Sequence, residues 1–311
     1  MPENRPIVFE SPGLRDPRGS RLQEHPMALT LRPATPADAP AAGAICYHAF
    51  KTISEQHNFP PDFPSVEAAV GALTMLLAHP AVYGVIAESE GRIVGSNFLW
   101  LDGPIASIGP ITVDPAAQNA SIGRRLMEHV IAHARQRGSA GIRLVQAAFH
   151  NRSLSLYAKL GLNIHEPLAL MQGPSINRPV VGFTVRTAAP ADLDACNALC
   201  TRIHGHDRPG ELRFAVAQKA ATVVEHDHRI VGYATGIGFF GHAIAESNEG
   251  LQALIAAAPA FAGPGFLLPT RNSDLLRWCL AHNLRVIQPM TLMAMGLYNE
   301  PAGVFLPSIC C

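Results

Sequence analysis

The most informative pattern of hydrophobic and polar positions lies between residues 109 and 162. A β-branched run at 111–113 predicts a short strand, which an Asp-Pro pair ends. From residue 122 onward, apolar side chains recur at helical spacing and predict an amphipathic helix. A further strand and a helix that opens near Asn151 complete the stretch.

The turn that joins the first of these strands to its helix predicts an anion site. It runs from Gln118 to Gly123, and it presents the free amides and the positive dipole end of a helix start. Gly123 lets a ligand approach the backbone closely. Arg124 and Arg125 are unfavourable beside that dipole unless an anion such as phosphate lies there.

The preceding residues supply two helices and three strands. Strands are predicted at 29–32, 82–88 and 92–100, and helices from about 38 to 49 and from Ser65 to about 78. The element order becomes strand, helix, helix, three strands, helix, strand, helix, strand. Gly109-Pro110 interrupts the fourth strand, and because proline cannot donate to a ladder we expect a bulge there. Such a bulge is either purely structural or part of a ligand site.

Composition limits the classes of protein and partner. The 311 residues suggest about two domains, and 48% hydrophobic residues with no formal net charge indicate packed cores without disorder. A neutral balance gives no footprint for nucleic acid or a membrane surface, and no apolar run is long enough to span a bilayer. Residues 1–27 lack periodicity and predict a flexible arm without a signal peptide, so we expect a cytoplasmic protein. The scattered cysteines predict neither zinc nor a disulfide framework.

An internal repeat divides the chain into two similar halves. The segment LTLRPATPAD at 29–38 is echoed by FTVRTAAPAD at 183–192, and GRIVG at 91–95 by HRIVG at 228–232. The helix near Asn151 has a counterpart from 272, with Trp278 at or next to the place of Tyr157. We therefore expect two tandem domains, 28–173 and 182–311, each of the α/β (α+β) class.

The second half has diverged at the predicted anion site. Its counterpart of the turn, 244–250, contains Glu246 and Glu249, which would repel a phosphate. We expect a single anion site per chain, in the first half. The short interval between 205 and 221 predicts that the second half lacks one helix, and its two His-x-His pairs, at 204–206 and 226–228, are expected in loops or turns.

At the turn and the following helix, the chain resembles the GNAT superfamily of acetyl-CoA-dependent N-acyltransferases. The family turn Gln/Arg-x-x-Gly-x-Gly/Ala matches Gln118-x-x-Ser121-x-Gly123, and a later Asn, Leu-Tyr and Gly-Phe pattern matches Asn151, Leu156-Tyr157 and Gly161-Leu162. Ser121 replaces a glycine. Either the backbone there stays right-handed, or the hydroxyl compensates for a strain of roughly 1 kcal/mol by binding a phosphate.

The resemblance implies that each domain is a mixed, mostly antiparallel twisted sheet flanked by helices. It also implies acetyl-CoA (coenzyme A) as cosubstrate and no metal. The fourth and fifth strands would splay to admit the pantetheine arm, and the turn and the later Asn would contact the rest of the cofactor. The cofactor-binding residues implied are Ile111, Thr112, Val113, Gln118, Asn119, Ala120, Ser121, Ile122, Gly123, Arg124 and Asn151. Asn151 is also expected to cap its helix.

The resemblance also implies direct attack of an amine on the thioester. Tyr157 is expected to protonate the leaving thiolate, although a tyrosine at such a helix position is also typical of a core. No carboxylate lies at 105–113 to act as base, so His150 and His57 are candidates.

The acceptor predicted is the amine of a small molecule or amino acid, and the chain is expected to be a monomer or homodimer. Two alternatives stay open: a non-catalytic acyl-CoA-binding sensor, and a structural tandem scaffold.

Overall fold

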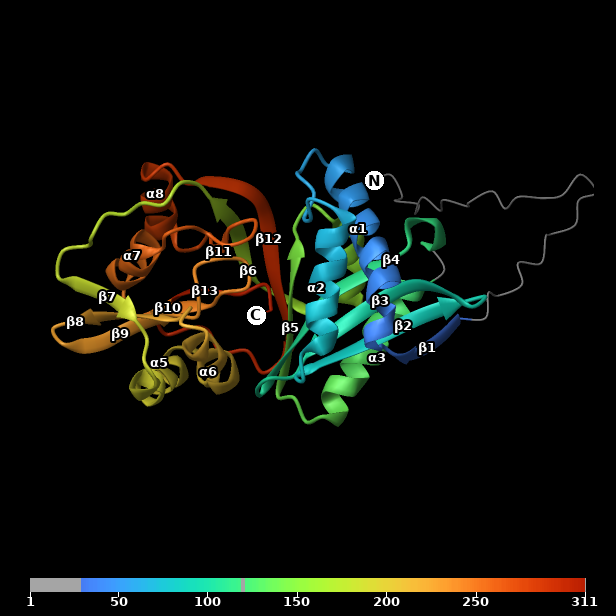
Figure 1. Ribbon diagram of the computed structural model, residues 1–311, viewed down its shortest axis with the longest axis horizontal. Helices are drawn as coiled ribbons and strands as arrows, with labels where there is room; N and C mark the ends of the chain where they lie inside the picture. The colour runs from blue at the N-terminus through green and yellow to red at the C-terminus, as the bar shows by residue number, and fades with distance from the viewer. Residues whose placement is uncertain (1–28, 119–120, 311) are drawn as a thin grey trace, which may run out of the picture.

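The computed structural model describes residues 29–118 and 121–310 (Figure 1). The predicted N-terminal arm, residues 1–27, and the predicted cofactor contacts Asn119 and Ala120 lie outside these ranges. The chain forms two lobes that meet along strands running through the middle of the molecule (Figure 1). Each lobe corresponds to one of the two sequence repeats, apart from two strands described below.

The first half follows the predicted order of elements. It comprises β1 (Leu29–Pro33), α1 (Ala39–Gln56), α2 (Val66–Ala78), β2 (Val82–Ser89), β3 (Arg92–Trp100), β4 (Ile105–Val113), α3 (Ile122–Gln136), β5 (Gly141–Ala147), α4 (Asn151–Lys159) and β6 (Asn163–Gln172). Side chains of α1 and α2 pack on one face of the sheet, and those of α3 and α4 on the other. The sheet is therefore covered on both faces.

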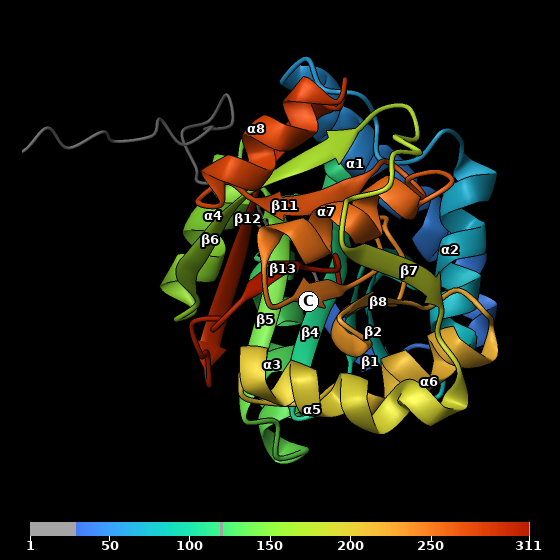
Figure 2. The same cartoon turned by 90° about the vertical axis from the view of Figure 1, so that its left-hand side faces the viewer.

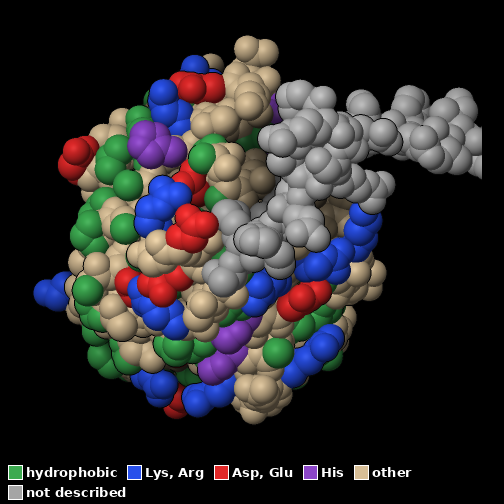
Figure 3. All heavy atoms as spheres, turned by 90° about the vertical axis from the view of Figure 1, so that its right-hand side faces the viewer, with side chains coloured by type: hydrophobic (Ala, Val, Ile, Leu, Met, Phe, Trp, Pro, Cys, Tyr) green, Lys and Arg blue, Asp and Glu red, His purple; other side chains and the backbone are tan. Residues whose placement is uncertain are grey.

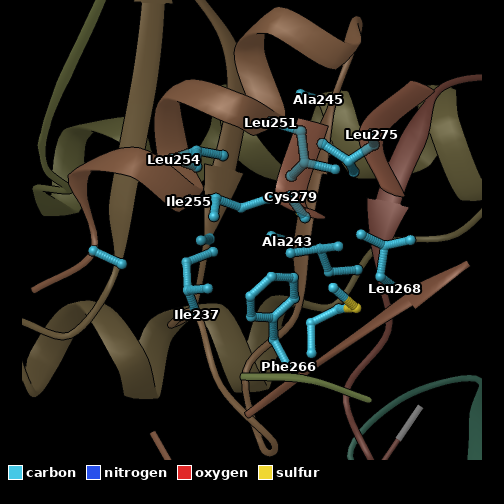
Figure 4. Packing of buried hydrophobic residues seen from close by; sticks show 14 of the residues in the cluster. Ile237, Ala243, Ala245, Leu251, Leu254, Ile255, Phe266, Leu268, Leu275 and Cys279 are labelled. Carbon is cyan, nitrogen blue, oxygen red and sulfur yellow. The ribbon is translucent and has the colours of Figure 1, made fainter. Parts of the chain in front are cut away.

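The second half repeats this order and adds a final strand. It comprises β7 (Phe183–Thr187), α5 (Leu193–His204), α6 (Pro209–Ala217), β8 (Thr222–His226), β9 (Arg229–Ala234), β10 (Ala243–Ala245), α7 (Asn248–Ala257), β11 (Phe266–Pro269), α8 (Ser273–Ala281), β12 (Arg285–Gly296) and β13 (Val304–Leu306). Figure 2 shows α7 and α8 on one side of its strands and α5 and α6 on the other. The α7 and α8 layer encloses an apolar core that includes Leu251, Leu275 and Phe266 (Figure 4).

One ion-pair network occurs in both halves and confirms the sequence repeat. In the first half, the Arg32 guanidinium contacts Asp38 and Glu88, each at 2.7 Å. In the second half, Arg186 contacts Asp192 and Glu225 at the same distance. Each network ties the first strand to the turn that opens the following helix.

The expectation that the second half lacks a helix is wrong. Residues Pro209–Ala217 form α6, the counterpart of α2. Proline at the first helical position is preorganised for a helix start, and it begins α6 directly after the short loop from α5. The helix has nine residues against thirteen in α2, so the short interval shortened a helix without removing it.

The last strands of the two halves are exchanged. The eight-stranded sheet has the order β1-β2-β3-β4-β5-β12-β6-β11, and the five-stranded sheet has the order β13-β10-β9-β8-β7. Strand β12 of the second half therefore pairs with β5 of the first, while β6 of the first half pairs with β11 of the second. Figure 1 shows β5, β6 and β12 side by side between the lobes.

The exchanged pair is internally symmetric. Leu168 of β6 lies opposite Met290 of β12. Two residues away in each direction, Glu166 lies opposite Leu292 and Leu170 lies opposite Gln288. This is the self-complementary pattern of a two-fold interface, here within one chain. A boundary between residues 173 and 182 thus separates two repeats of sequence, and it does not separate two complete sheets.

In the described part of the chain, no helix is long and apolar enough to cross a membrane. On the face of the first half seen in Figure 3, basic and acidic side chains are interspersed.

Candidate functional site

The sheet of the first half opens between β4 and β5. The two strands pair in parallel only where Ile105–Ser107 face Gly141–Arg143. Between Asn97 and Leu99 of β3, the register with β4 shifts by one residue, which places the predicted bulge at Gly109-Pro110. Beyond Ser107, no other strand in the described ranges pairs with β4 on the side of β5. Backbone amides and carbonyls of Ile111 and Val113 therefore face an open edge, whereas those of Thr112, which lies between them, face Ser96 of β3.

The helix start beside this edge has the backbone that close ligand approach requires. Ser121 precedes α3 in the left-handed conformation, with φ 59° and ψ 13°, so the alternative of a right-handed backbone is wrong. Its side chain makes no capping hydrogen bond, and such a conformation costs a non-glycine residue roughly 1 kcal/mol. The amides that follow, from Ile122 and Gly123, begin a helix of fifteen residues with no acidic residue in its first turn.

The basic side chains at this turn differ in their contacts. Arg124 lies 3.4 Å from Glu128, and Arg125 donates to the Leu29 carbonyl at 3.0 Å. A third cation, Arg152 on α4, donates to the side chain of Gln118 at 3.0 Å. Sequence reasoning missed Arg152, although it directly follows the predicted Asn151. It connects the start of α4 to the predicted phosphate turn.

His150 caps α4, so the expectation that Asn151 caps this helix is wrong. The Nδ1 atom of His150 accepts from the Ser153 amide at 2.9 Å. In the second half, Asn272 accepts from the Leu275 amide in the same way, so it corresponds to His150. Asn151 begins the helix with an exposed side chain, which leaves it available for a ligand at this end of the opening.

Tyr157 points from α4 into the core beside the opening. Burial raises the pKa of its hydroxyl, and a hydrogen bond with Ser153 opposes that shift. The Ser153 hydroxyl lies 3.2 Å from Oε1 of Gln146 on β5. Nε2 of this buried Gln146 has no partner among the described residues. A buried donor without a partner is costly unless a ligand or water satisfies it, so the Gln146 amide marks a polar position next to Tyr157.

The two histidines predicted as bases differ in which ring nitrogen carries the proton of the neutral ring. Because Nδ1 of His150 accepts a hydrogen bond, the neutral ring carries its proton on Nε2, which can donate but not accept. Burial also lowers the pKa of His150. His57 instead lies with Nδ1 at 2.9 Å from the Ile53 carbonyl, and this contact makes Nδ1 the donor. Its Nε2 then has a free lone pair, so His57 is the better base of the two.

A half-buried carboxylate in the loop between α1 and α2 was missed as a candidate base. Burial raises the pKa of Asp62 to about 6, and a hydrogen bond with Gln288 partly offsets this. Gln288 lies on β12, so the second half supplies the partner of this carboxylate. The same loop packs over the end of β5, where the rings of Phe59 and Phe149 stack with centroids 4.3 Å apart. Carboxylates were considered as a base only at 105–113. Asp62 was not included because the sequence does not show how far a loop residue is buried.

The expectation that the two His-x-His pairs lie in loops or turns is wrong for His204, the last residue of α5, and for His226, the last residue of β8. It holds for His206 and His228, which lie outside the helices and strands. His204 and His206 are buried, and Nε2 of His204 lies 3.1 Å from Nε2 of His242. Burial lowers the pKa of both His204 and His242 well below the usual range, so this pair is neutral. Across residues 29–118 and 121–310, no group of three or more His, Cys, Asp or Glu residues is placed to hold a metal.

Comparison with known sequences gives a partial match. The sequence model of the acetyltransferase (GNAT) family matches residues 48–162. An IAA acetyltransferase from Azospirillum brasilense is 30% identical over 87 residues, which cover 27% of this chain and 57% of that protein. The chain thus spans little more than half the length of this relative.

Comparison with solved structures extends the likeness to both halves. A putative acetyltransferase from Pyrococcus horikoshii superposes with a TM-score of 0.68 at 18% identity, covering 89% of this chain and 94% of the other. A tandem GNAT protein from the clavulanic acid biosynthesis pathway superposes with a TM-score of 0.51 at 16% identity, covering 90% and 99%. At these identities the likeness shows the fold, which is a tandem of two GNAT-like halves.

Proposed function

Residues 48–162 match the sequence model of the acetyltransferase (GNAT) family, and from this premise we propose that the chain transfers an acetyl group from acetyl-CoA to the amine of a small molecule or amino acid. The observation that carries the proposal is the open edge of β4 beside a left-handed helix start. The name of the curated relative, an acetyltransferase, supports acetyl transfer as the reaction. The acceptor is inferred from the loop described below.

The residues present fit the cosubstrate. Acetyl-CoA supplies the activated acetyl group as a thioester. Backbone groups of Ile111–Val113 would hydrogen-bond the pantetheine arm as a neighbouring strand does, and the unpartnered Gln146 amide offers a buried donor beside it. The α3 amides, with Arg124 and Arg152, would hold the phosphates. A Cβ at Gly123 would stand 3.7 Å from the nearest side chain, so packing within the chain does not itself require a glycine at this position.

Tyr157 is the proposed acid. Its raised pKa keeps the hydroxyl protonated at neutral pH, so it holds a proton for the departing CoA sulfur. The counterpart of Tyr157 in the second half is Cys279, because both residues follow their helix caps by the same number of positions. The second half therefore has no tyrosine for this role, which supports one active site per chain.

Asp62 is the proposed base, with His57 nearby in the same loop. A carboxyl group with a pKa near 6 is ionised at neutral pH and is well matched to take a proton from an attacking amine. Its negative charge would also attract the ammonium form of the acceptor. The stacked Phe59 and Phe149 rings form an apolar wall of the same loop, which suits an acceptor with an apolar body.

Two measurements test this function. Acetyl-CoA at a hundred times its dissociation constant should add about 2.7 kcal/mol to the unfolding free energy and raise the melting temperature. Thiol release should follow when a panel of primary amines is added, and Tyr157→Phe should lower kcat by roughly a hundredfold or more while CoA binding is kept. No shift at millimolar acetyl-CoA would contradict the proposal.

Two observations favour a second candidate function. Strand β4 contains no carboxylate, and Ser121 replaces the family glycine, which are features of a binding module without turnover. A stabilising shift with acetyl-CoA, combined with no thiol release across the amine panel, would favour this acyl-CoA sensor over the enzyme. The scaffold alternative would require that acetyl-CoA produce no shift at all.

A further inference from the structure

The strand edge that is open in the first half is closed in the second. There β10 pairs with β9 on one side and with β13 on the other. On the β13 side, Ala243 faces Leu306, Ile244 faces Phe305 and Ala245 faces Val304. Strand β10 is the counterpart of β4. Strand β13 thus lies beside β10 on the side that corresponds to the open edge of β4.

The two edges correspond residue by residue. In the first half, Gly95 of β3 faces Val113, and the Asp114 amide donates to the Val94 carbonyl at 2.9 Å. In the second half, Gly232 of β9 faces Ala245, and the Glu246 amide donates to the Val231 carbonyl at 2.9 Å. Since GRIVG and HRIVG are the aligned repeat segments, Ala243–Ala245 correspond to Ile111–Val113. Strand β13 therefore pairs with the counterparts of the residues proposed to bind pantetheine.

The side chains of β13 are built into the second half. Phe305 packs in the cluster of α5 and α6, which also holds Ile244 and Tyr233. Leu306 packs in the opposite cluster with Ala243 and the side chains of α7. Figure 4 shows this second cluster, to which Ala243 and Ala245 of β10 and Leu268 of β11 all belong. Alternation to both faces is the pattern of an integral strand and not of a loosely attached tail.

The second half also lacks the turn that would hold phosphates. Residues 114–120 separate Val113 from Ser121, whereas Glu246 alone separates Ala245 from Ser247. Ser247 has an extended backbone with φ −141°, and its side chain accepts from the Gly250 amide. Its hydroxyl thereby caps α7, and Glu249 occupies the first turn. The chain itself satisfies the helix start that an anion would otherwise occupy.

We propose that β13 is a built-in occupant of the second cofactor slot, so that each chain binds one acyl-CoA in the first half and none in the second. The assignment of the first slot to acyl-CoA rests on the proposed function, whereas the closure of the second slot does not. A covalently attached strand acts at a high effective concentration, so free cosubstrate does not displace it. Strand β13 also covers an edge that would otherwise be open to pairing with other chains.

Calorimetric titration and hydrogen exchange of the full chain test this directly. Titration with CoA should give one site per chain. Amides of 111–113 should exchange more slowly with CoA, whereas those of 243–245 should be protected to the same degree with and without it. Two sites per chain, or protection of 243–245 that depends on CoA, would overturn the proposal.

Two variants at one position separate backbone pairing from side-chain packing. Val304 lies opposite Ala245, whose backbone points away from β9 and toward β13, so Val304→Pro removes an amide that faces β10 and should speed exchange of 243–245 by roughly tenfold or more. Val304→Ala keeps the backbone and should leave that segment protected. If both variants leave exchange of 243–245 unchanged, the closure by β13 is refuted. If CoA fails to bind the parent chain, the proposed function fails, yet the pair of variants still decides whether β13 closes the slot.

Discussion

Replacement of Asp62 by Asn should make the protein more stable at high pH and less active. The carboxyl is half-buried in the loop between α1 and α2, and partial loss of solvent raises its pKa from 3.8 to about 6. A partly buried charge retained against stability is typical of a functional site. Asn keeps the shape and can still hydrogen-bond Gln288, so the substitution removes the charge and little else.

The magnitude follows from the pKa difference between the folded and unfolded states. Because the folded pKa is the higher one, the folded state favours the protonated acid. Stability is therefore fully kept below about pH 4 and is lost as pH rises through about 6. The shift of about two pKa units corresponds to at most roughly 3 kcal/mol. At pH 8, Asp62→Asn should raise the melting temperature by up to about 5 °C, and at pH 4 by little.

The assay is thermal unfolding of the parent and the variant from pH 4 to pH 8, with thiol release measured at pH 7.5 on the same samples. Glu90→Gln, which removes an exposed carboxylate in the turn between β2 and β3, is the matched control and should change neither quantity. If Asp62 is the base, kcat should fall by roughly a hundredfold or more with CoA binding unchanged. A variant that is less stable than the parent at pH 8, or a stability difference that is the same at pH 4 and pH 8, would show that the ionised Asp62 carboxylate does not destabilise the fold.

Three other substitutions test separate parts of the account. Ser121→Gly relieves a left-handed backbone and should stabilise the fold by about 1 kcal/mol, with CoA affinity kept or raised in titration; a loss of affinity would show that the hydroxyl binds phosphate. Arg271→Ala leaves the fully buried Glu166 without its contact at 2.6 Å and should cost about 1–3 kcal/mol in denaturant unfolding, part of which Glu166→Gln in the same chain should restore. The neutral His204 and His242 pair loses stability as pH falls below about 6.5, because the unfolded rings take up protons there. His242→Gln should therefore lower the pH of acid unfolding, and an unchanged midpoint would contradict this.

Local sequence signals predicted the repeated elements well. The Arg and Asp at matched positions of each repeat form the same ion pairs, and Ser65 caps α2 as expected. The Gly109-Pro110 pair lies at the predicted bulge. These features depend on a few neighbouring residues, so composition and spacing were sufficient to predict them.

Contacts between distant segments were not predictable in this way. Strands β6 and β12 carry similar apolar patterns, so nothing in either one indicates that each pairs in the sheet of the other half. The same exchange places Gln288 beside Asp62, which is why the second half's contribution to the candidate site was missed. A strand as short as β13 gives almost no signal, and its role emerges only from its pairing with β10.

The start of α4 was predicted one residue too late. His150 and Asn151 are adjacent, and asparagine is by far the more common cap, yet the imidazole of His150 accepts the hydrogen bond. The choice shifts the alignment of α4 with α8 by one residue. It also changes the counterpart of Tyr157 from Trp278 to Cys279.

If one acyl-CoA lies along the open edge of β4, a crystal structure of the full chain grown with saturating CoA should show one cofactor per chain. Its pantetheine arm should be hydrogen-bonded to the backbone of 111–113 and its phosphates should lie at the start of α3, with β13 still paired with β10. Density for CoA in the second half, or an empty opening between β4 and β5 at saturation, would contradict this prediction.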